Sequence, residues 1–275
     1  MQIADAHNDL LMNLVSKKQI NNYLQKNVVN IFTAFYVCPK LQKLGYNNLL
    51  DLILKKYDLI SCFPQCTLTL ENIGYIVNKT SLYRLIKLKP FCATLTWNFN
   101  NCLAGGAYDN GSLTNWGKLV INELENNQIL IDVAHLNEIS FYEFIKITSK
   151  PIFCSHTCSK SIYSINRNLS NIQLKIIKDT GGFVGLCLYN SLLYNQVADF
   201  ELIRKHLDVF LQYAGENNVG FGTDFNGTGE QNPIGIKFDY IGLDKLYDYL
   251  LNFYDKSLLQ KVFYQNLINF KNKFK

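Results

Sequence analysis

The 275-residue sequence predicts an α/β fold in which eight parallel strands and their helices close into a (β/α)8 TIM barrel. Three observations predict it. The length is within the usual range for one such barrel. Short runs of β-branched and aromatic residues alternate with longer helical patterns, which favours βα units and a parallel sheet. Long Gly/Asn-rich segments follow two of the predicted strands, where barrel enzymes place active-site loops.

Eight runs have the composition of buried strands, because β-branched and aromatic side chains fit a pleated sheet. The predicted strands are Gln2–Ala6, Val28–Val37, Thr67–Leu70, Cys92–Thr96, Ile129–Ala134, Ile152–Ser155, Gly182–Leu188 and Val219–Thr223.

Helical patterns separate these strands. The predicted helices are Leu41–Tyr57, Ser81–Lys87, Thr114–Asn126, Glu138–Thr148, Ile172–Asp179, Phe200–Ala214 and two amphipathic helices in Leu243–Phe274, broken near Asp255. We therefore expect one domain over residues 1–275 that ends in C-terminal helices. An open doubly wound sheet or two smaller domains are the alternatives. The two long loops are Asn98–Leu113 and Phe225–Gly235.

Composition argues against nucleic-acid and membrane partners. The net charge is only +5, and the Lys and Arg residues form no dense tract. No apolar run approaches the roughly 20 residues that cross a bilayer, and the first residues lack a signal-peptide pattern. The eight cysteines are too few for a disulfide framework in a chain of this length, so we expect reduced, mostly buried thiols and a cytoplasmic location.

Histidine provides the sharpest chemical signal. Three of the four histidines, His7, His135 and His156, stand at or just past the carboxyl end of a predicted strand. The fourth, His206, lies within a predicted helix and is expected to be structural or exposed. A single strand-end histidine is more often a packed core residue. Three at one rim of a barrel indicate a metal site, because imidazole is the commonest metal ligand near neutral pH.

Carboxylates occupy the same class of position. His7 and Asp9 are two apart, so on an extended backbone both can face one metal ion, although this pair alone is weak evidence. Glu71 closes an apolar strand, where its two oxygens suit a ligand that bridges two metals roughly 3.5–4 Å apart. Asp224 closes the run VGFGT in the same way.

Several ordered segments carry a family resemblance. They are DAHNDL, LEN at 70–72, LTWN at 95–98, IDVAH, PIFCSH, NRN at 166–168, GGFVGL and GFGTDFNG. Each is modest alone, but the ordered set is specific, covers nearly the whole chain and resembles the membrane (renal-type) dipeptidase family. The resemblance implies a barrel of the metal-dependent hydrolase type that holds two zinc ions and hydrolyses dipeptides by attack of a metal-bridging hydroxide.

The resemblance also implies residue roles. His7 and Asp9 would bind the first zinc ion, His135 and His156 the second, and Glu71 would bridge them. Asp224 would be the proton-transfer carboxylate. Arg167 would hold the terminal carboxylate of the substrate, a role that suits its planar, bidentate guanidinium; outside the NRN segment it would be taken for an ordinary surface arginine.

The sequence departs from the family pattern at two positions. Asn226 stands where the usual pattern has a second acid, which removes a charge beside the site. Trp97 stands where the animal enzymes carry a histidine, although bacterial-type relatives also have tryptophan there. Trp97 donates one indole N–H and cannot act as an acid or base near neutral pH, so we expect it to line the substrate site.

Other functions remain open at this point. The same barrel and metals would support another amidohydrolase reaction, such as deacylation of an N-acyl amino acid, because a fold does not fix a substrate. A non-catalytic peptide-binding relative is less favoured, since all the metal positions and Asp224 carry suitable residues. The preferred dipeptide, its stereochemistry, β-lactam hydrolysis and the oligomeric state, with a homodimer as one possibility, are not encoded in any motif.

Overall fold

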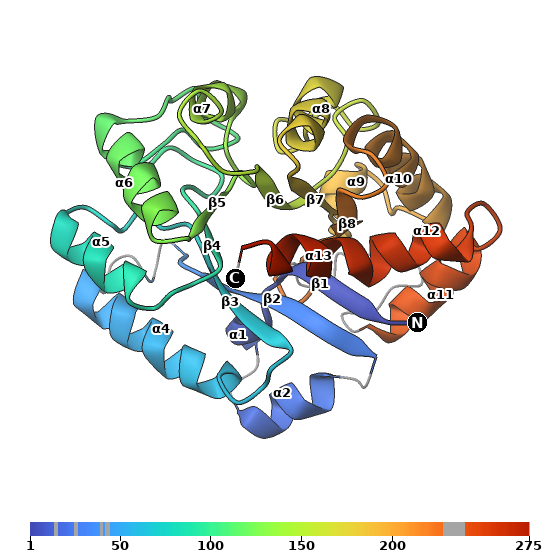
Figure 1. The fold of residues 1–275 in the computed structure, drawn as a ribbon, viewed down its shortest axis with the longest axis horizontal. Coiled ribbons are helices and arrows are strands. Elements are labelled where there is room, and N and C mark those ends of the chain that lie inside the picture. Colours follow the sequence, from blue (N-terminus) through green and yellow to red (C-terminus); the bar gives the residue numbers. More distant parts are fainter. Residues whose placement is uncertain (14–15, 25–26, 39–40, 42–44, 228–239, 275) are drawn as a thin grey trace.

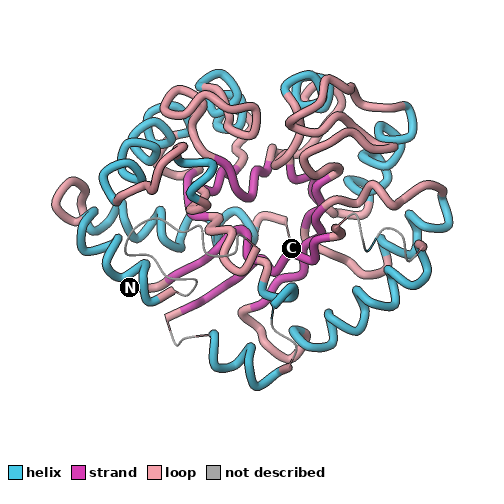
Figure 2. The backbone as a smooth tube through the Cα atoms, turned by 180° about the vertical axis from the view of Figure 1, so that it is seen from behind, coloured by secondary structure: helices cyan, strands magenta, loops and turns pink. Residues whose placement is uncertain are grey.

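A computed structural model describes residues 1–13, 16–24, 27–38, 41, 45–227 and 240–274. Eight parallel strands form a closed barrel in sequence order, with helices around it (Figures 1 and 2), which confirms the predicted fold class. The strands are β1 (Ile3–Asn8), β2 (Val28–Tyr36), β3 (Cys66–Glu71), β4 (Cys92–Thr94), β5 (Leu130–Asp132), β6 (Phe153–Thr157), β7 (Phe183–Leu186) and β8 (Val219–Phe221). Each overlaps one predicted strand.

The outer helices are α4 (Tyr46–Ile60), α5 (Lys79–Ile86), α6 (Asn115–Asn126), α7 (Glu138–Phe144), α8 (Asn171–Asp179), α10 (Phe200–Ala214) and α11 (Ile241–Leu250). All of them lie within or overlap the predicted helices. Five of the helices that follow strands, α5, α6, α7, α8 and α10, begin at a side chain that caps their free N–H groups. Asn78 and Ser170 form capping boxes with Ser81 and Gln173, and the Asp199 carboxylate accepts the Leu202 N–H.

The C-terminal tail divides as predicted. After α11, Asp255 precedes a second helical segment, built from α12 (Lys256–Gln260), a π-helical turn (Lys261–Gln265) and α13 (Asn266–Asn272). Three short helices were not predicted, namely α1 (Leu10–Asn13), α2 (Lys17–Tyr23) and α9 (Asn190–Leu193). They are one or two turns long, which is too short to show a helical period. Parts of two expected segments, residues 42–44 of Leu41–Tyr57 and residues 228–235 of Phe225–Gly235, lie outside the described residues.

The amino-terminal end of the barrel is filled by aromatic side chains. Helix α13 lies against β1, β7 and β8 (Figure 1), and its Phe270 stacks at 5.4 Å on Phe153, which itself stacks on Phe183 at 5.7 Å. Phe32 and Leu267 belong to the same buried cluster. This end is therefore packed core, and a site can open only at the carboxyl ends of the strands. No helix among the described residues is long and apolar enough to span a bilayer.

His206, which the sequence predicted to be either structural or exposed, is a buried structural residue. Its side chain in α10 is fully buried. Nδ1 accepts the Ser159 N–H at 3.0 Å, and Nε2 lies 3.0 Å from the Leu193 carbonyl oxygen. The ring is therefore neutral, with its proton on Nε2. Burial lowers the pKa of His206 to about 4.

This buried ring should make stability depend on pH. The pKa of His206 is about 4 in the folded chain and 6.5 in the unfolded chain, so the unfolded state binds more protons below pH 6.5. We expect His206 to contribute a loss of about 2 kcal/mol in unfolding free energy between pH 8 and pH 5. Denaturant unfolding at both pH values, compared with His206→Gln, measures it. An equal pH dependence in both proteins would contradict the assignment.

Candidate metal centre at the barrel mouth

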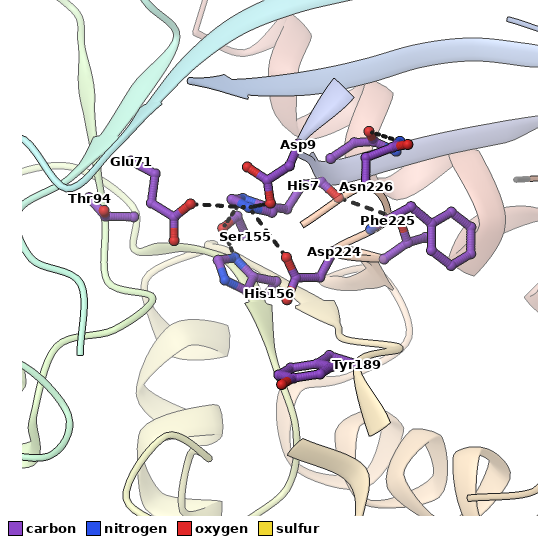
Figure 3. Close-up of polar contacts among 12 residues, drawn as sticks. His7, Asp9, Glu71, Thr94, Ser155, His156, Tyr189, Asp224, Phe225 and Asn226 are labelled. Carbon is purple, nitrogen blue, oxygen red and sulfur yellow. Dashed lines mark hydrogen bonds and ion pairs between the residues drawn. The ribbon is translucent and has the colours of Figure 1, made fainter. Parts of the chain in front are cut away.

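The barrel gathers the predicted ligands at one end. His7 and His156 lie within strands β1 and β6, and Glu71 is the last residue of β3. Asp9, His135 and Asp224 come shortly after the carboxyl ends of β1, β5 and β8. Figure 3 shows the side chains of His7, Asp9, Glu71, His156 and Asp224 gathered together. Five of the side chains are almost completely buried, namely His7, Asp9, Glu71, His135 and His156. The sixth, Asp224, has a side chain that is 13% exposed.

Two of these residues reach the mouth through unusual backbone conformations. His135 has φ 69° and Asp224 has φ 62°, in the left-handed region that L-residues other than Gly, Asn and Asp seldom adopt. Such conformations cost on the order of 1 kcal/mol and recur at functional sites. Each lies three residues past the end of a short strand, at the point where the chain leaves the barrel.

Glu71 stands between two histidines. One carboxylate oxygen, Oε1, lies 2.8 Å from His135 Nε2, and the other, Oε2, lies 3.7 Å from His7 Nε2. His135 Nε2 is also 3.1 Å from His156 Nε2. All three imidazoles therefore present Nε2 to the same space, and the two oxygens of Glu71 face different histidines.

Two further carboxylates complete the cluster around His7. Its Nε2 lies 3.6 Å from Asp9 Oδ2 and 3.8 Å from Asp224 Oδ1. Ligand-type atoms of His7, Glu71 and His156 lie within 4.8 Å of one another, as do those of His7, Asp9 and Asp224. Asp224, expected only as a proton-transfer group, thus also lies at ligand distance from the first predicted metal position.

The electrostatics of the cluster favour a cation. Burial raises the pKa of Glu71 to about 8 and that of Asp224 to about 7, and the charge of Asp9 adds to both. Burial lowers the pKa of His7, but the surrounding carboxylates outweigh it and raise that pKa to about 10. Burial holds the pKa values of His135 and His156 well below the usual range, so both rings are neutral. Positive charge is therefore stabilised where the Nε2 atoms and carboxylates meet.

Two buried atoms of this cluster have no hydrogen-bond partner among the described residues. His7 Nε2 and Asp9 Oδ1 make no hydrogen bond although neither is accessible to solvent. An unpaired buried polar atom costs about 1–3 kcal/mol, so such atoms usually have a partner. Imidazole nitrogen and carboxylate oxygen are the donors that zinc and similar divalent ions take. The residues present fit a divalent metal centre.

The opposite ring nitrogens lie next to side-chain oxygens of neutral residues, and His135 Nδ1 also lies 3.1 Å from Arg167 Nε. His135 Nδ1 lies 3.0 Å from Asn98 Oδ1. Ser155 Oγ lies 2.7 Å from His156 Nδ1 and 3.4 Å from His7 Nδ1. The sequence analysis assigned no role to Asn98 or Ser155. Asn98 contacts a histidine from another part of the barrel, and Ser155 contacts its own neighbour His156 and a histidine on another strand.

A cavity of about 380 Å³ opens directly above the cluster. Trp97 and Tyr36 form one wall with ring centroids 5.4 Å apart, and Tyr189, Tyr108 and Leu192 also line the cavity. Only Trp97 among these was expected from the sequence. The predicted clamp residue Arg167 also lines the cavity and is 5% exposed, so it is not an ordinary surface arginine.

The segment after β8 fits closely against the ligands. A Cβ on Gly227 would lie 2.0 Å from Asp9 Oδ2, so only glycine leaves room for that carboxylate. Asn226, which replaces the usual acid, lines the cavity, and its Nδ2 donates to Asn8 Oδ1 at 2.9 Å. Asn226 is therefore tied to the β1 end by a neutral contact.

Comparison with protein families gives a match over most of the chain. The model of the membrane dipeptidase family (peptidase family M19) matches residues 46–273. An uncharacterised protein encoded in the region 5′ of pqqA in Klebsiella pneumoniae is 30% identical over 186 residues, which are 62% of this chain and 67% of that protein. An uncharacterised dipeptidase of Schizosaccharomyces pombe is 24% identical over 66% of this chain and 46% of its own length, so the chain spans less than half of that relative.

Solved structures share the fold. A metallopeptidase from Rhodobacter sphaeroides, crystallised with a phosphinate mimic of L-Ala-D-Ala, superposes with a TM-score of 0.84 at 20% identity, over 100% of this chain and 99% of that one. An amidohydrolase from Pseudomonas aeruginosa gives 0.85 at 18% identity, over 98% and 95%. At these identities the likeness concerns the fold.

The geometry predicts the metal content. We expect about two divalent ions per chain after loading with zinc and removal of excess, because one oxygen of Glu71 faces His7 and the other faces His135. Glu71→Gln should retain less than half of that metal, since it removes the charge between His7 and His135. Elemental analysis measures the content. Exposed Glu138→Gln is the control and should bind as the unchanged protein does; equal metal in Glu71→Gln would contradict the shared role.

Proposed function

Because the chain belongs to the membrane dipeptidase family of peptidases, we propose that it hydrolyses the peptide bond of dipeptides with a free C-terminal carboxylate. The observation that carries the proposal is one small cavity that combines a buried cluster of metal-ligand side chains with a buried arginine. The metal ligands would act on the scissile carbonyl group, and the arginine would recognise the carboxylate end.

We assign the metal positions by the donors that face them. His7 and Asp9 would hold the first zinc ion, His135 and His156 the second, and Glu71 would contact both. When bound, two such ions lower the pKa of a water molecule for attack and polarise the scissile carbonyl oxygen. The six buried side chains supply the positioning and exclude bulk water from the reacting atoms.

Asp224 is suited to move the proton. The attacking water must lose a proton and the leaving amine must gain one, and a carboxylate at the mouth can do both in turn. Asp224 lines the cavity beside His7 and is contacted at Oδ2 by the Cys187 thiol at 3.8 Å. From the wall of the cavity, Asp224 would pass the proton from the attacking water to the leaving amine.

Arg167 is placed to hold the carboxylate end. Nε lies 3.1 Å from His135 Nδ1, and Nη2 donates to the His156 carbonyl oxygen at 3.2 Å. Asn98 requires a proton on His135 Nδ1, whereas Arg167 requires a lone pair there, so both hydrogen bonds cannot exist together. A histidine that gives Nε2 to a metal ion keeps its proton on Nδ1 and donates to Asn98, which leaves Arg167 Nε free for the substrate.

The cavity walls narrow the choice of side chain. Trp97 and Tyr36 provide flat apolar surface, and burial raises the pKa of Tyr36 far above neutrality, so its hydroxyl stays uncharged. At about 380 Å³, the space suits a small substrate with a small or flat apolar side chain.

All eight cysteines are free thiols, which supports the proposed cytoplasmic location.

Replacing Asp224 should separate chemistry from assembly. Asp224→Asn keeps the shape of the side chain but cannot accept the proton, so we expect kcat on dipeptides to fall roughly 10²-fold or more. Metal content and thermal midpoint should stay close to those of the unchanged protein. Loss of metal with unchanged turnover per loaded chain would instead make Asp224 mainly a ligand.

The clamp predicts a preference for free acids over amides. A C-terminal amide cannot accept two charge-assisted hydrogen bonds, so we expect kcat/KM for dipeptide amides to be roughly tenfold to a hundredfold lower than for dipeptides. Arg167→Ala should make acids and amides similarly poor substrates while metal is retained. Equal rates on both substrates in the unchanged enzyme would refute the clamp. Higher activity on N-acyl amino acids than on dipeptides would favour deacylation.

A further inference from the structure

Behind the candidate metal centre, the histidine Nδ1 atoms outnumber the side-chain oxygens in the described part of the chain that can accept hydrogen bonds from them. A neutral imidazole has one N–H, so a histidine that gives Nε2 to a metal ion carries its proton on Nδ1 and needs an acceptor there. Three histidines present Nε2 to the centre, but their Nδ1 atoms have only two side-chain oxygen partners among the described residues, Asn98 Oδ1 and Ser155 Oγ.

Ser155 serves two of these rings. Its side chain is buried, and Oγ lies 2.7 Å from His156 Nδ1 and 3.4 Å from His7 Nδ1 (Figure 3). The two imidazoles lie face to face, with centroids 3.8 Å apart and planes 34° from parallel. A hydroxyl oxygen has two acceptor sites and can receive both N–H groups at once. The two distances imply a strong hydrogen bond to His156 and a weaker one to His7.

The serine is itself held in place. The buried Asp132 carboxylate at the end of β5 accepts the Ser155 N–H at 2.9 Å and the Ala134 N–H at 3.0 Å. On the other side, Gly185 and Gly222 pack so closely that a Cβ on either would lie 2.0 Å or less from the Ser155 carbonyl oxygen. The backbone of Ser155 is therefore held by β5, β7 and β8 and not by the histidines.

We infer that Ser155 is a positioning residue shared by the two metal positions, and that it orients His7 for one ion and His156 for the other. The inference rests on the proposed two-metal function. Asn98 supports His135 alone, so it affects the second position only. Through Ser155, a ring fixed by the first ion holds the hydroxyl in the orientation that the other ring needs.

This sharing predicts a double effect of one substitution. Loss of a partner behind a metal-bound histidine typically lowers metal affinity 10- to 100-fold. Ser155→Ala should therefore weaken both zinc-binding steps, and the step that involves His156 should weaken more because its contact is shorter. Asn98→Ala should weaken one step and leave the other within about twofold.

The experiment is a zinc titration of the metal-free protein against a chromophoric chelator, which yields both dissociation constants. Ser159→Ala is the matched control, because Ser159 is also fully buried and lies four residues further along, but its hydroxyl contacts Ser161. We expect two affected steps in Ser155→Ala and none in Ser159→Ala. A loss confined to one step, or no loss, would overturn the shared role.

A second variant and an NMR measurement allow the inference to be tested even if Ser155→Ala does not fold. Ser155→Cys keeps nearly the same size but offers only a weak acceptor, so it should reproduce both losses if Ser155→Ala does not fold. In the zinc-loaded unchanged protein, the Nδ1–H protons of His7 and His156 should give slowly exchanging imidazole signals by NMR. Both signals should vanish in whichever Ser155 variant folds. Persistence of both signals would contradict the inference. An unchanged protein that binds no zinc would refute the proposed function itself.

Discussion

The structure depends on one buried carboxylate that joins the first strand to the last. β1 and β8 pair through Asp5 and Phe221, and the Asp5 side chain adds hydrogen bonds from the Thr223 N–H at 2.8 Å, the Thr223 hydroxyl at 2.6 Å and the Tyr240 hydroxyl at 2.8 Å. Asp5 also accepts the His7 N–H at 3.2 Å. The Asp5 carboxylate, which joins the first and last strands, thus fixes the strand ends that carry His7, Asp9 and Asp224. The geometry of the candidate metal centre therefore depends on this closure of the barrel.

Closure of the barrel brings together carboxylates whose negative charge the neighbouring side chains among the described residues do not balance. Three carboxylates and three imidazoles share one buried space, and burial raises the pKa of Glu71 to about 8 and that of Asp224 to about 7. The charge of one protonated histidine is not enough to pair all the acids. Divalent cations would relieve this imbalance and would give the unpaired Nε2 of His7 and Oδ1 of Asp9 a partner. Electrostatics and hydrogen bonding therefore favour the same kind of occupant.

Much of this could be predicted from the sequence, because strand runs and strand-end histidines are local signals. All eight strands were found, and the residues expected as ligands meet at one rim. The left-handed backbone at His135 could not be foreseen, since His135 is neither Gly, Asn nor Asp. Ser155 was also missed. Neighbours on a strand normally face opposite sides, and its contact with His7 exists only once β1 and β6 face each other across a closed barrel.

The most direct test of the account is anomalous diffraction from crystals of the zinc-loaded protein, recorded at the zinc absorption edge. The account predicts two peaks at the barrel mouth, roughly 3.5–4 Å apart, with one oxygen of Glu71 within about 2.0–2.2 Å of each ion. His7 should contact the first ion, and His135 and His156 the second. A single ion bound away from Glu71, or zinc found only at the protein surface, would contradict the account.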